Sequence, residues 1–98
     1  MFSTTWGFTC EPGLACASVP YGGGWYVFKF YAYGTYNLSN WYGTDTAFND
    51  QTGGAAMRLY NGSNAQVECI RGQDPIAHFD MNVNWTPIYK IRLTSSAC

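Results

Sequence analysis

The chain has 98 residues with five basic and six acidic side chains, which gives a formal net charge of −1 at pH 7. This length suits one domain, near the lower limit at which a hydrophobic core alone suffices. Aromatic residues make up 18% and charged residues only 11%, which excludes a disordered chain. No apolar run reaches the roughly 18 residues of a membrane-spanning helix. The basic residues are scattered in the sequence, which gives no electrostatic reason to expect nucleic acid, at Lys29, Arg58, Arg71, Lys90 and Arg92.

The chain repeats one pattern of predicted strands in its two halves. In the first half, an apolar strand over residues 14–19 and an aromatic strand over 25–30 flank a Gly-rich turn at 20–24. In the second half, predicted strands over 55–60 and 65–70 flank an Asn- and Gly-containing turn. Each half then passes through a polar connection to a further strand. Two such units in so short a chain predict a small β domain that works through its surface.

Alternation with a period of two indicates which faces of the strands are buried. Met57 and Leu59 alternate with Ala56, Arg58 and Tyr60, and a last strand over 88–93 turns its Ile and Leu side chains inward. Such strands with one buried face predict an all-β sandwich of two packed antiparallel sheets. The connections at 36–46 and 73–86 are expected to hold a helical turn each.

Four cysteines in a short chain with few charges are typical of two disulfides formed in an oxidising compartment. Zinc is the competing interpretation, but no cysteine pair has the spacing of a zinc knuckle and His78 is the only histidine. Four cysteines allow three pairings, among which the sequence alone does not choose. We expect Cys10–Cys16, which closes a tight loop over a Pro-Gly turn, and Cys69–Cys98, which pins the last strand. We therefore expect an extracellular, secreted protein.

Several segments together resemble a known family. Residues 10–16 (CEPGLAC), 21–28 (YGGGWYVF), 36–38 (YNL) and 48–55 (FNDQTGGA) are similar to secreted actinobacterial βγ-crystallin-like proteins. These are grouped with small peptidase inhibitors typified by an actinobacterial metalloproteinase inhibitor. The resemblance extends over residues 10–93 and implies extracellular release. Inhibition of a metalloprotease is known for few members of the family.

The resemblance also implies a fold and a division of the chain. It implies a βγ-crystallin-like sandwich of two Greek-key motifs, which two disulfides would staple. We expect one domain over residues 1–98. Within it, an N-terminal strand or docking tail at 1–9 precedes a first Greek key at 10–54 and a second at 55–98.

The family often binds calcium through an Asn-Asp element, which makes Asn49 and Asp50 candidate ligands here. Glycines at 53–54 stand where the family has hydroxyl ligands, and the matching stretch at 84–89 lacks the second acidic residue and both hydroxyls. The alternative is that Asn49 and Asp50 cap a turn by bonding their own backbone. We favour the turn and expect no cofactor and no metal.

Catalysis has little support in the sequence. His78 lies close to Asp74 and Asp80, so a base with an orienting carboxylate is conceivable. No serine, however, lies in a recognisable nucleophile elbow, and small β domains lack the deep pocket that chemistry needs. We predict that the chain is not an enzyme.

The large aromatic residues exceed what two small sheets can bury, which predicts a binding surface. We expect Trp41, Tyr42 and Trp85 to be exposed and to bind a partner, with Trp41 and Tyr42 in a recognition loop. Trp6, in an apolar N-terminal segment, is the fourth expected anchor. The side chains expected in the core are Tyr26, Phe28, Phe30 and Tyr60.

The leading hypothesis is a secreted, inhibitor-like protein-binding module that docks on another extracellular protein, such as a protease or a protease-like fold. One alternative is an adaptor subunit of a secreted antibacterial toxin complex. Another is carbohydrate or cell-wall binding, in which Trp41, Tyr42 and Trp85 stack on sugar rings. A membrane-active antimicrobial protein is disfavoured because the net charge is slightly negative. We therefore expect neither nucleic acid nor a membrane as a partner.

Overall fold

The computed structural model describes residues 2–4, 10–21, 24–39, 41–73 and 76–98. These residues form nine β-strands and no helix, so the predicted all-β class is confirmed. The strands are β1 (Phe2–Thr4), β2 (Ala15–Tyr21), β3 (Gly24–Phe30), β4 (Gly34–Asn37), β5 (Thr44–Asn49), β6 (Ala56–Asn61), β7 (Gln66–Arg71), β8 (His78–Asn84) and β9 (Ile88–Thr94). Within the described ranges no helix is long and apolar enough to span a membrane.

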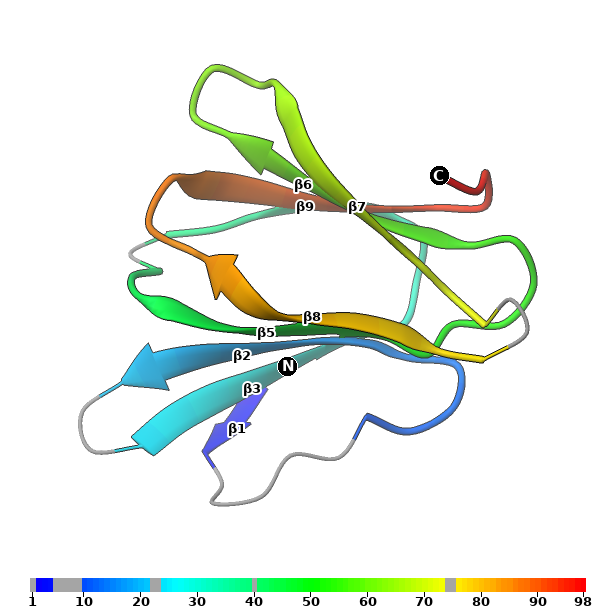
Figure 1. The fold of residues 1–98 in the computed structure, drawn as a ribbon, viewed down its shortest axis with the longest axis horizontal. Coiled ribbons are helices and arrows are strands. Elements are labelled where there is room, and N and C mark those ends of the chain that lie inside the picture. The colour runs from blue at the N-terminus through cyan, green and yellow to red at the C-terminus, as the bar shows by residue number, and fades with distance from the viewer. Residues whose placement is uncertain (1, 5–9, 22–23, 40, 74–75) are drawn as a thin grey trace.

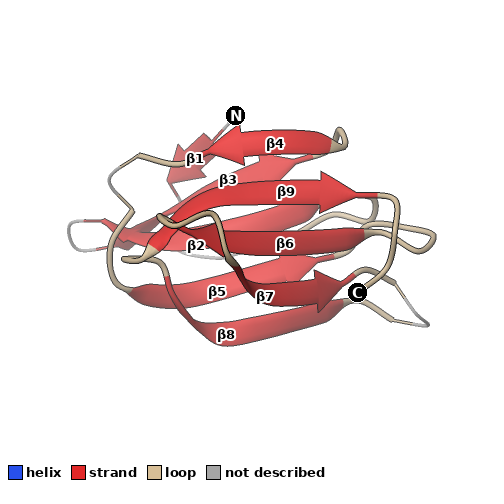
Figure 2. Ribbon diagram, turned by 90° about the horizontal axis from the view of Figure 1, so that it is seen from above, coloured by secondary structure: helices blue, strands red, loops and turns tan. Residues whose placement is uncertain are grey.

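The strands form two antiparallel sheets that lie face to face (Figures 1 and 2). Sheet A has the strand order β1-β3-β2-β5-β8, and sheet B has the order β4-β9-β6-β7. Strand β4 leaves the first half of the chain to pair with β9, and β8 leaves the second half to pair with β5. Each half therefore contributes one strand to the sheet of the other half, so the two halves share one core.

The core lies between the sheets and is filled by alternate residues of each strand. Ala15, Ala17 and Val19 of β2 point inward from sheet A, and Met57 and Leu59 of β6 point inward from sheet B. Burying one large apolar side chain stabilises the fold by about 1.5–3 kcal/mol. The other buried members of this cluster are Trp41, Ala47, Ile70, Val83, Trp85, Ile88, Ile91 and Leu93.

The strands expected from alternation are confirmed as β2, β3, β6, β7 and β9. The prediction of a helical turn in each of the two polar connections is wrong. Residues 36–46 contain the start of β5, and residues 73–86 contain β8. Strand β5 has few apolar residues, yet it lies between β2 and β8 with a ladder on each side. Its sheet position, rather than its own sequence pattern, makes it a strand.

Strand β8 carries a β-bulge that reverses which face its side chains occupy. Its register against β5 shifts between Asp45 and Ala47, where two residues of β8 oppose one residue of β5. Met81, which lies within the bulge, points to solvent, and beyond the bulge Val83 is buried in the core. A strict period of two would have placed both side chains on one face.

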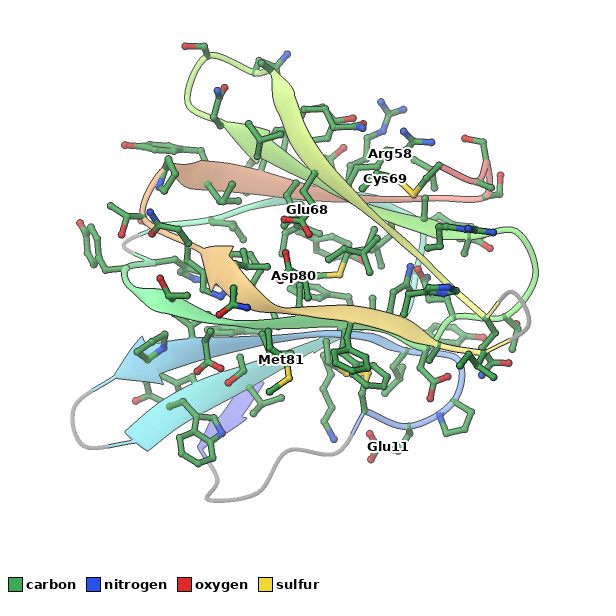
Figure 3. All side chains as sticks on the ribbon, in the orientation of Figure 1. Glu11, Arg58, Glu68, Cys69, Asp80 and Met81 are labelled. Carbon is green, nitrogen blue, oxygen red and sulfur yellow. A yellow bond between two sulfur atoms is a disulfide. The ribbon has the colours of Figure 1, made fainter. Side chains whose placement is uncertain are left out.

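Both expected disulfides are present. Cys10 is bonded to Cys16, and Cys69 is bonded to Cys98. The second bridge ties the C-terminal end of the chain to β7, on the outer side of sheet B (Figure 3). Disulfides of this kind are typical of extracellular proteins.

Candidate binding surfaces

Two of the four expected partner-binding anchors are core residues, so the expectation that they are exposed is wrong. Trp85 is 0% exposed and Trp41 is 9% exposed. The Trp85 indole Nε1 donates a hydrogen bond to the Ser18 carbonyl at 2.8 Å. Each tryptophan comes shortly before the last strand of its half, where the chain crosses the open end of the sandwich and a large ring can close the core.

The other two anchors have different outcomes. Tyr42 is exposed, as expected, on the loop that leads into β5. Trp6 lies outside the described residues. Of the aromatic side chains expected in the core, Phe28 and Phe30 are partly buried and pack against the core cluster. Tyr26 and Tyr60 are also partly buried.

An apolar groove that the sequence did not predict lies on the outer face of sheet A. Ala15, Ala17 and Val19 point into the core, so the alternate residue Ser18 points outward on the same strand. The register then places the Phe48 and Phe79 side chains next to each other on this outer face. The groove has a volume of about 420 Å³. Its lining consists of Ser18, Trp25, Asp45, Thr46, Phe48, Phe79 and Met81.

The rim of this groove is apolar and accessible. Met81 is 63% exposed and Phe79 is 54% exposed, and Figure 3 shows Met81 on the side of sheet A that faces away from sheet B. The Phe48 and Phe79 rings are stacked at 5.4 Å with an interplanar angle of 5°. At one side of the groove, Asp45 Oδ2 accepts a hydrogen bond from Ser18 Oγ at 3.0 Å. The groove thus combines an aromatic wall with one carboxylate.

The signal that could have located this groove is the pair Phe79 and Met81. Both are large apolar residues at alternate positions of one short segment, flanked by His, Asp and Asn. That pattern indicates a strand with one apolar face. The sequence, however, does not show that the bulge in β8 turns this face outward, and a core position would have been inferred.

Asn49 and Asp50, the calcium candidates, are engaged with the protein. Asn49 is fully buried: its Oδ1 accepts a hydrogen bond from the Gln51 N–H at 3.1 Å, and its Nδ2 donates to the Ile70 carbonyl at 2.9 Å. Asp50 Oδ1 accepts a hydrogen bond from Gln73 Nε2 at 2.6 Å. The Asn49 side chain therefore bonds the backbone N–H of the residue two positions further along the chain, as the turn interpretation expects. In the described part of the chain, no three or more His, Cys, Asp or Glu side chains are grouped so that they could hold a metal.

Glu68 of β7 and Asp80 of β8 form a carboxyl pair at the open side of the sandwich, where the edge strands of the two sheets approach each other (Figure 3). Partial burial raises the pKa of Glu68 to about 7, and the hydrogen bond with Asp80 and the negative charge of Asp80 add to this shift. The hydrogen bond from Glu68 lowers the pKa of Asp80. The two shifts share one contribution, in which a protonated Glu68 donates a hydrogen bond to an ionised Asp80.

His78, the only imidazole, is half-buried at the start of β8. Its Nδ1 lies 3.0 Å from the Gly72 carbonyl oxygen. This contact suits a histidine that holds two neighbouring segments together. Whether the chain has enzymatic activity remains a prediction, which this contact does not test.

In comparisons with known proteins, no family model, no curated protein and no solved structure matches the chain.

Proposed function

We propose that the protein is a secreted, non-enzymatic binding module that docks on another extracellular protein through the apolar groove of sheet A. The observation that carries this proposal is the exposed pair Phe79 and Met81 beside the Phe48–Phe79 stack. Large apolar side chains that are more than half exposed and contiguous mark interaction sites on soluble proteins. Aromatic residues and Met are also enriched at protein interfaces.

We also propose that the fold is a βγ-crystallin-like pair of Greek keys. In each half, the first two strands form a hairpin and the fourth pairs beside the first, as β5 does beside β2 and β9 does beside β6. The third strand, β4 or β8, lies in the opposite sheet. The equivalence of the two halves supports an origin from a repeated motif. The two disulfides support secretion.

The groove fits one kind of occupant best: a bulky apolar side chain from an extended or loop segment of the partner, with a basic residue next to it. The apolar side chain would lie against the stacked phenyl rings and displace water from Met81. The basic residue would meet Asp45, the only charged residue that lines the groove among the described residues. This pattern is found in anchor-and-pocket docking, in which one side chain provides most of the affinity.

The test compares three forms of the disulfide-bonded chain as bait for proteins in the culture supernatant of its own source. The forms are the natural sequence, Met81→Asp and the control Ile76→Asp. Ile76 is also a strongly exposed apolar residue, but it does not line the groove. A protein retained by the natural chain is purified, and its affinity is measured for all three forms after their melting temperatures have been shown to agree.

We expect Met81→Asp to weaken binding about thirtyfold, which corresponds to about 2 kcal/mol. We expect Ile76→Asp to change the affinity less than about threefold, as an exposed residue outside the contact should. Equal affinity for the natural chain and Met81→Asp would show that the groove is not the docking site. A concentration-dependent dimer that Met81→Asp abolishes would show that the groove instead binds a second copy of the chain.

A further inference from the structure

Two exposed tyrosines lie on the turn that joins β3 to β4, and neither of them lines the groove. Tyr31 is 73% exposed and Tyr33 is 56% exposed. Neither makes a hydrogen bond or a ring contact with another described residue. A tyrosine ring has a large apolar face and a polar hydroxyl, so two uncommitted rings on one turn suit a ligand with both properties.

A small hollow of about 150 Å³ lies beside these rings, and Gln51 lines it together with Thr52 and Gly13. Gln51 is 97% buried, since only 3% of it is exposed, and its Oε1 has no hydrogen-bond partner among the described residues. A buried polar atom without a partner destabilises the fold, because it has lost its hydrogen bond to water without gaining another. The amide can turn about its last torsion, which has a broad energy minimum, to present a polar atom to the hollow.

The backbone around Gln51 is held firmly, which fixes the position from which its side chain extends. The Gln51 N–H donates to Asn49 Oδ1, and the Gln51 carbonyl accepts from the Gln73 N–H at 2.8 Å. A Cβ atom at Gly72 would lie only 2.6 Å from the same carbonyl oxygen, which shows how closely the two segments pack. A buried amide oxygen without a partner, on a backbone held this firmly, suits a position at which a ligand completes the hydrogen bonding.

A second, larger hollow of about 470 Å³ shares Tyr33 with the first. It is lined by Arg92 and by hydroxyl-bearing residues, among them Thr35, Thr94, Ser95 and Ser96. Arg92 is exposed and makes no hydrogen bond or ion pair with any other described residue. The two hollows therefore adjoin at Tyr33, and Gln51 lines one of them while Arg92 lines the other.

The charges around Arg92 favour an anion. Arg58 lies directly opposite Arg92 in the β6–β9 register, although like charges opposite each other destabilise a sheet. Arg71 and Lys90 occupy the same outer face of sheet B by register. The folded chain thus gathers four of its five basic residues on one face, which the scattered positions in the sequence did not predict.

We propose that the site around Tyr33 binds an acidic saccharide of the uronic acid class. The apolar C–H face of a sugar ring would stack on Tyr33 or Tyr31. Its hydroxyl groups would bond the Gln51 amide and the Thr52 hydroxyl, and its carboxylate would pair with Arg92.

The arrangement fits a sugar better than a nucleic acid or a simple anion. A simple anion would need only the guanidinium and would leave the exposed rings of Tyr31 and Tyr33 unused. A nucleic acid would need a longer row of cations along its backbone, and Arg58 is already bonded to Thr94, Ser96 and Ala97. Stacking faces, amide, hydroxyls and one available cation together match the groups of an acidic sugar.

The test titrates the disulfide-bonded chain with trigalacturonate and follows the signals of the Gln51 side-chain amide and the Arg92 Nε–H by NMR. Maltotriose is the neutral probe of equal length, and oligothymidylate is the polyanion without a sugar acid. Two variant pairs test the residues. Tyr33→Ala is matched by Tyr89→Ala, an exposed tyrosine outside both hollows, and Arg92→Gln is matched by Lys90→Gln, which removes the same charge nearby.

We expect trigalacturonate to shift both signals and to bind about tenfold more tightly than maltotriose. Tyr33→Ala should weaken trigalacturonate binding about tenfold and Arg92→Gln should remove the preference over maltotriose, whereas both control variants should change affinity less than about threefold. Unmoved Gln51 and Arg92 signals at millimolar trigalacturonate would overturn the proposal. Equal loss in Arg92→Gln and Lys90→Gln, or tighter binding of oligothymidylate, would show a general polyanion surface and would also overturn it.

Discussion

The indole rings of Trp41 and Trp85 meet edge to face in the core, with their centroids 5.1 Å apart and their planes at 82°. Each tryptophan stands three residues before the last strand of its half: β5 begins at Thr44, and β9 begins at the equivalent position, Ile88. The backbone N–H of Trp85 also donates a hydrogen bond to the Gly43 carbonyl at 2.8 Å. The two halves of the chain are therefore joined at equivalent positions by a direct contact between equivalent residues.

Replacing Trp85 should test whether this contact holds the sandwich together. We expect Trp85→Ala to lower the free energy of unfolding by about 3–5 kcal/mol, because it leaves a cavity and removes the partner of the Ser18 carbonyl. Trp85→Phe should cost less, since most of the apolar volume remains. Chemical denaturation followed by circular dichroism measures both changes, and a loss below about 1 kcal/mol for Trp85→Ala would contradict the core role.

Tyr42→Ala is the matched test of an exposed aromatic residue in the same region. Tyr42 is 60% exposed, so we expect the free energy of unfolding to change by no more than about 0.5–1 kcal/mol. Any loss of partner binding in this variant would then report a contact rather than misfolding. A large fall in melting temperature would show instead that the loop before β5 depends on this ring.

The disulfides should differ in how much they stabilise the fold. Cys69 and Cys98 are 29 residues apart, whereas Cys10 and Cys16 are 6 apart. In the chain-entropy model the longer loop contributes about 4 kcal/mol and the shorter about 2. The double variant Cys69→Ala/Cys98→Ala should therefore lose more stability in denaturant than Cys10→Ala/Cys16→Ala. Mass spectrometry of a non-reducing digest checks the pairing first, and a Cys16–Cys69 peptide would contradict it.

The sequence predicted those strands whose own residues report burial. Met57 and Leu59 alternate with Arg58 and Tyr60, and that pattern is what the sheet shows. Prediction from alternation failed for β5, which has few apolar residues, and for β8, whose apolar residues change face at the bulge. Position in the sheet, which arises from contacts distant in sequence, decides these two strands, and local periodicity does not contain that information.

The candidate surfaces were harder to predict than the fold. Trp41 and Trp85 were expected at the surface because aromatic residues are so numerous, but composition does not say which rings close the core. The surface around Phe79 and Met81 depends on the bulge in β8. The basic outer face of sheet B depends on the register between β6 and β9. Gln51 carries no motif, and only its burial without a partner for Oε1 distinguishes it.

Calcium should have little effect on the fold. The Asn49 oxygen and nitrogen are both bonded to backbone groups in a fully buried position, so a cation would have to displace them. We expect millimolar calcium to leave the melting temperature nearly unchanged, because only a ligand that binds the folded state raises it. Asn49→Ala, in contrast, should cost about 1–3 kcal/mol by leaving the Ile70 carbonyl without its donor. A calcium-dependent rise of several degrees would contradict the turn role of Asn49.

The Glu68–Asp80 pair should make stability depend on pH near neutrality. The folded-state pKa of Glu68 is raised to about 7, above its ordinary value of about 4.3 in an unfolded chain. Between these values the folded state binds more protons than the unfolded state, so stability falls as pH rises from about 4.5 to about 7. Asp80 acts in the opposite sense: its lowered pKa contributes stability that is lost only in more acidic solution.

Glu68→Gln should remove most of the fall in stability between about pH 5 and pH 8, because the amide can still donate to Asp80 but cannot ionise. At pH 8 the variant should be more stable than the natural chain by of the order of 1 kcal/mol, a value reduced for solvent screening because Glu68 is only partly buried. Glu11→Gln is the matched control: Glu11 lies on the outer side of sheet A, paired with Lys29, and its lowered pKa keeps it ionised throughout this range (Figure 3). Urea denaturation at pH 5, 6, 7 and 8 measures all three chains. Parallel pH profiles for Glu68→Gln and the natural chain would show that the two carboxyl groups do not share a proton.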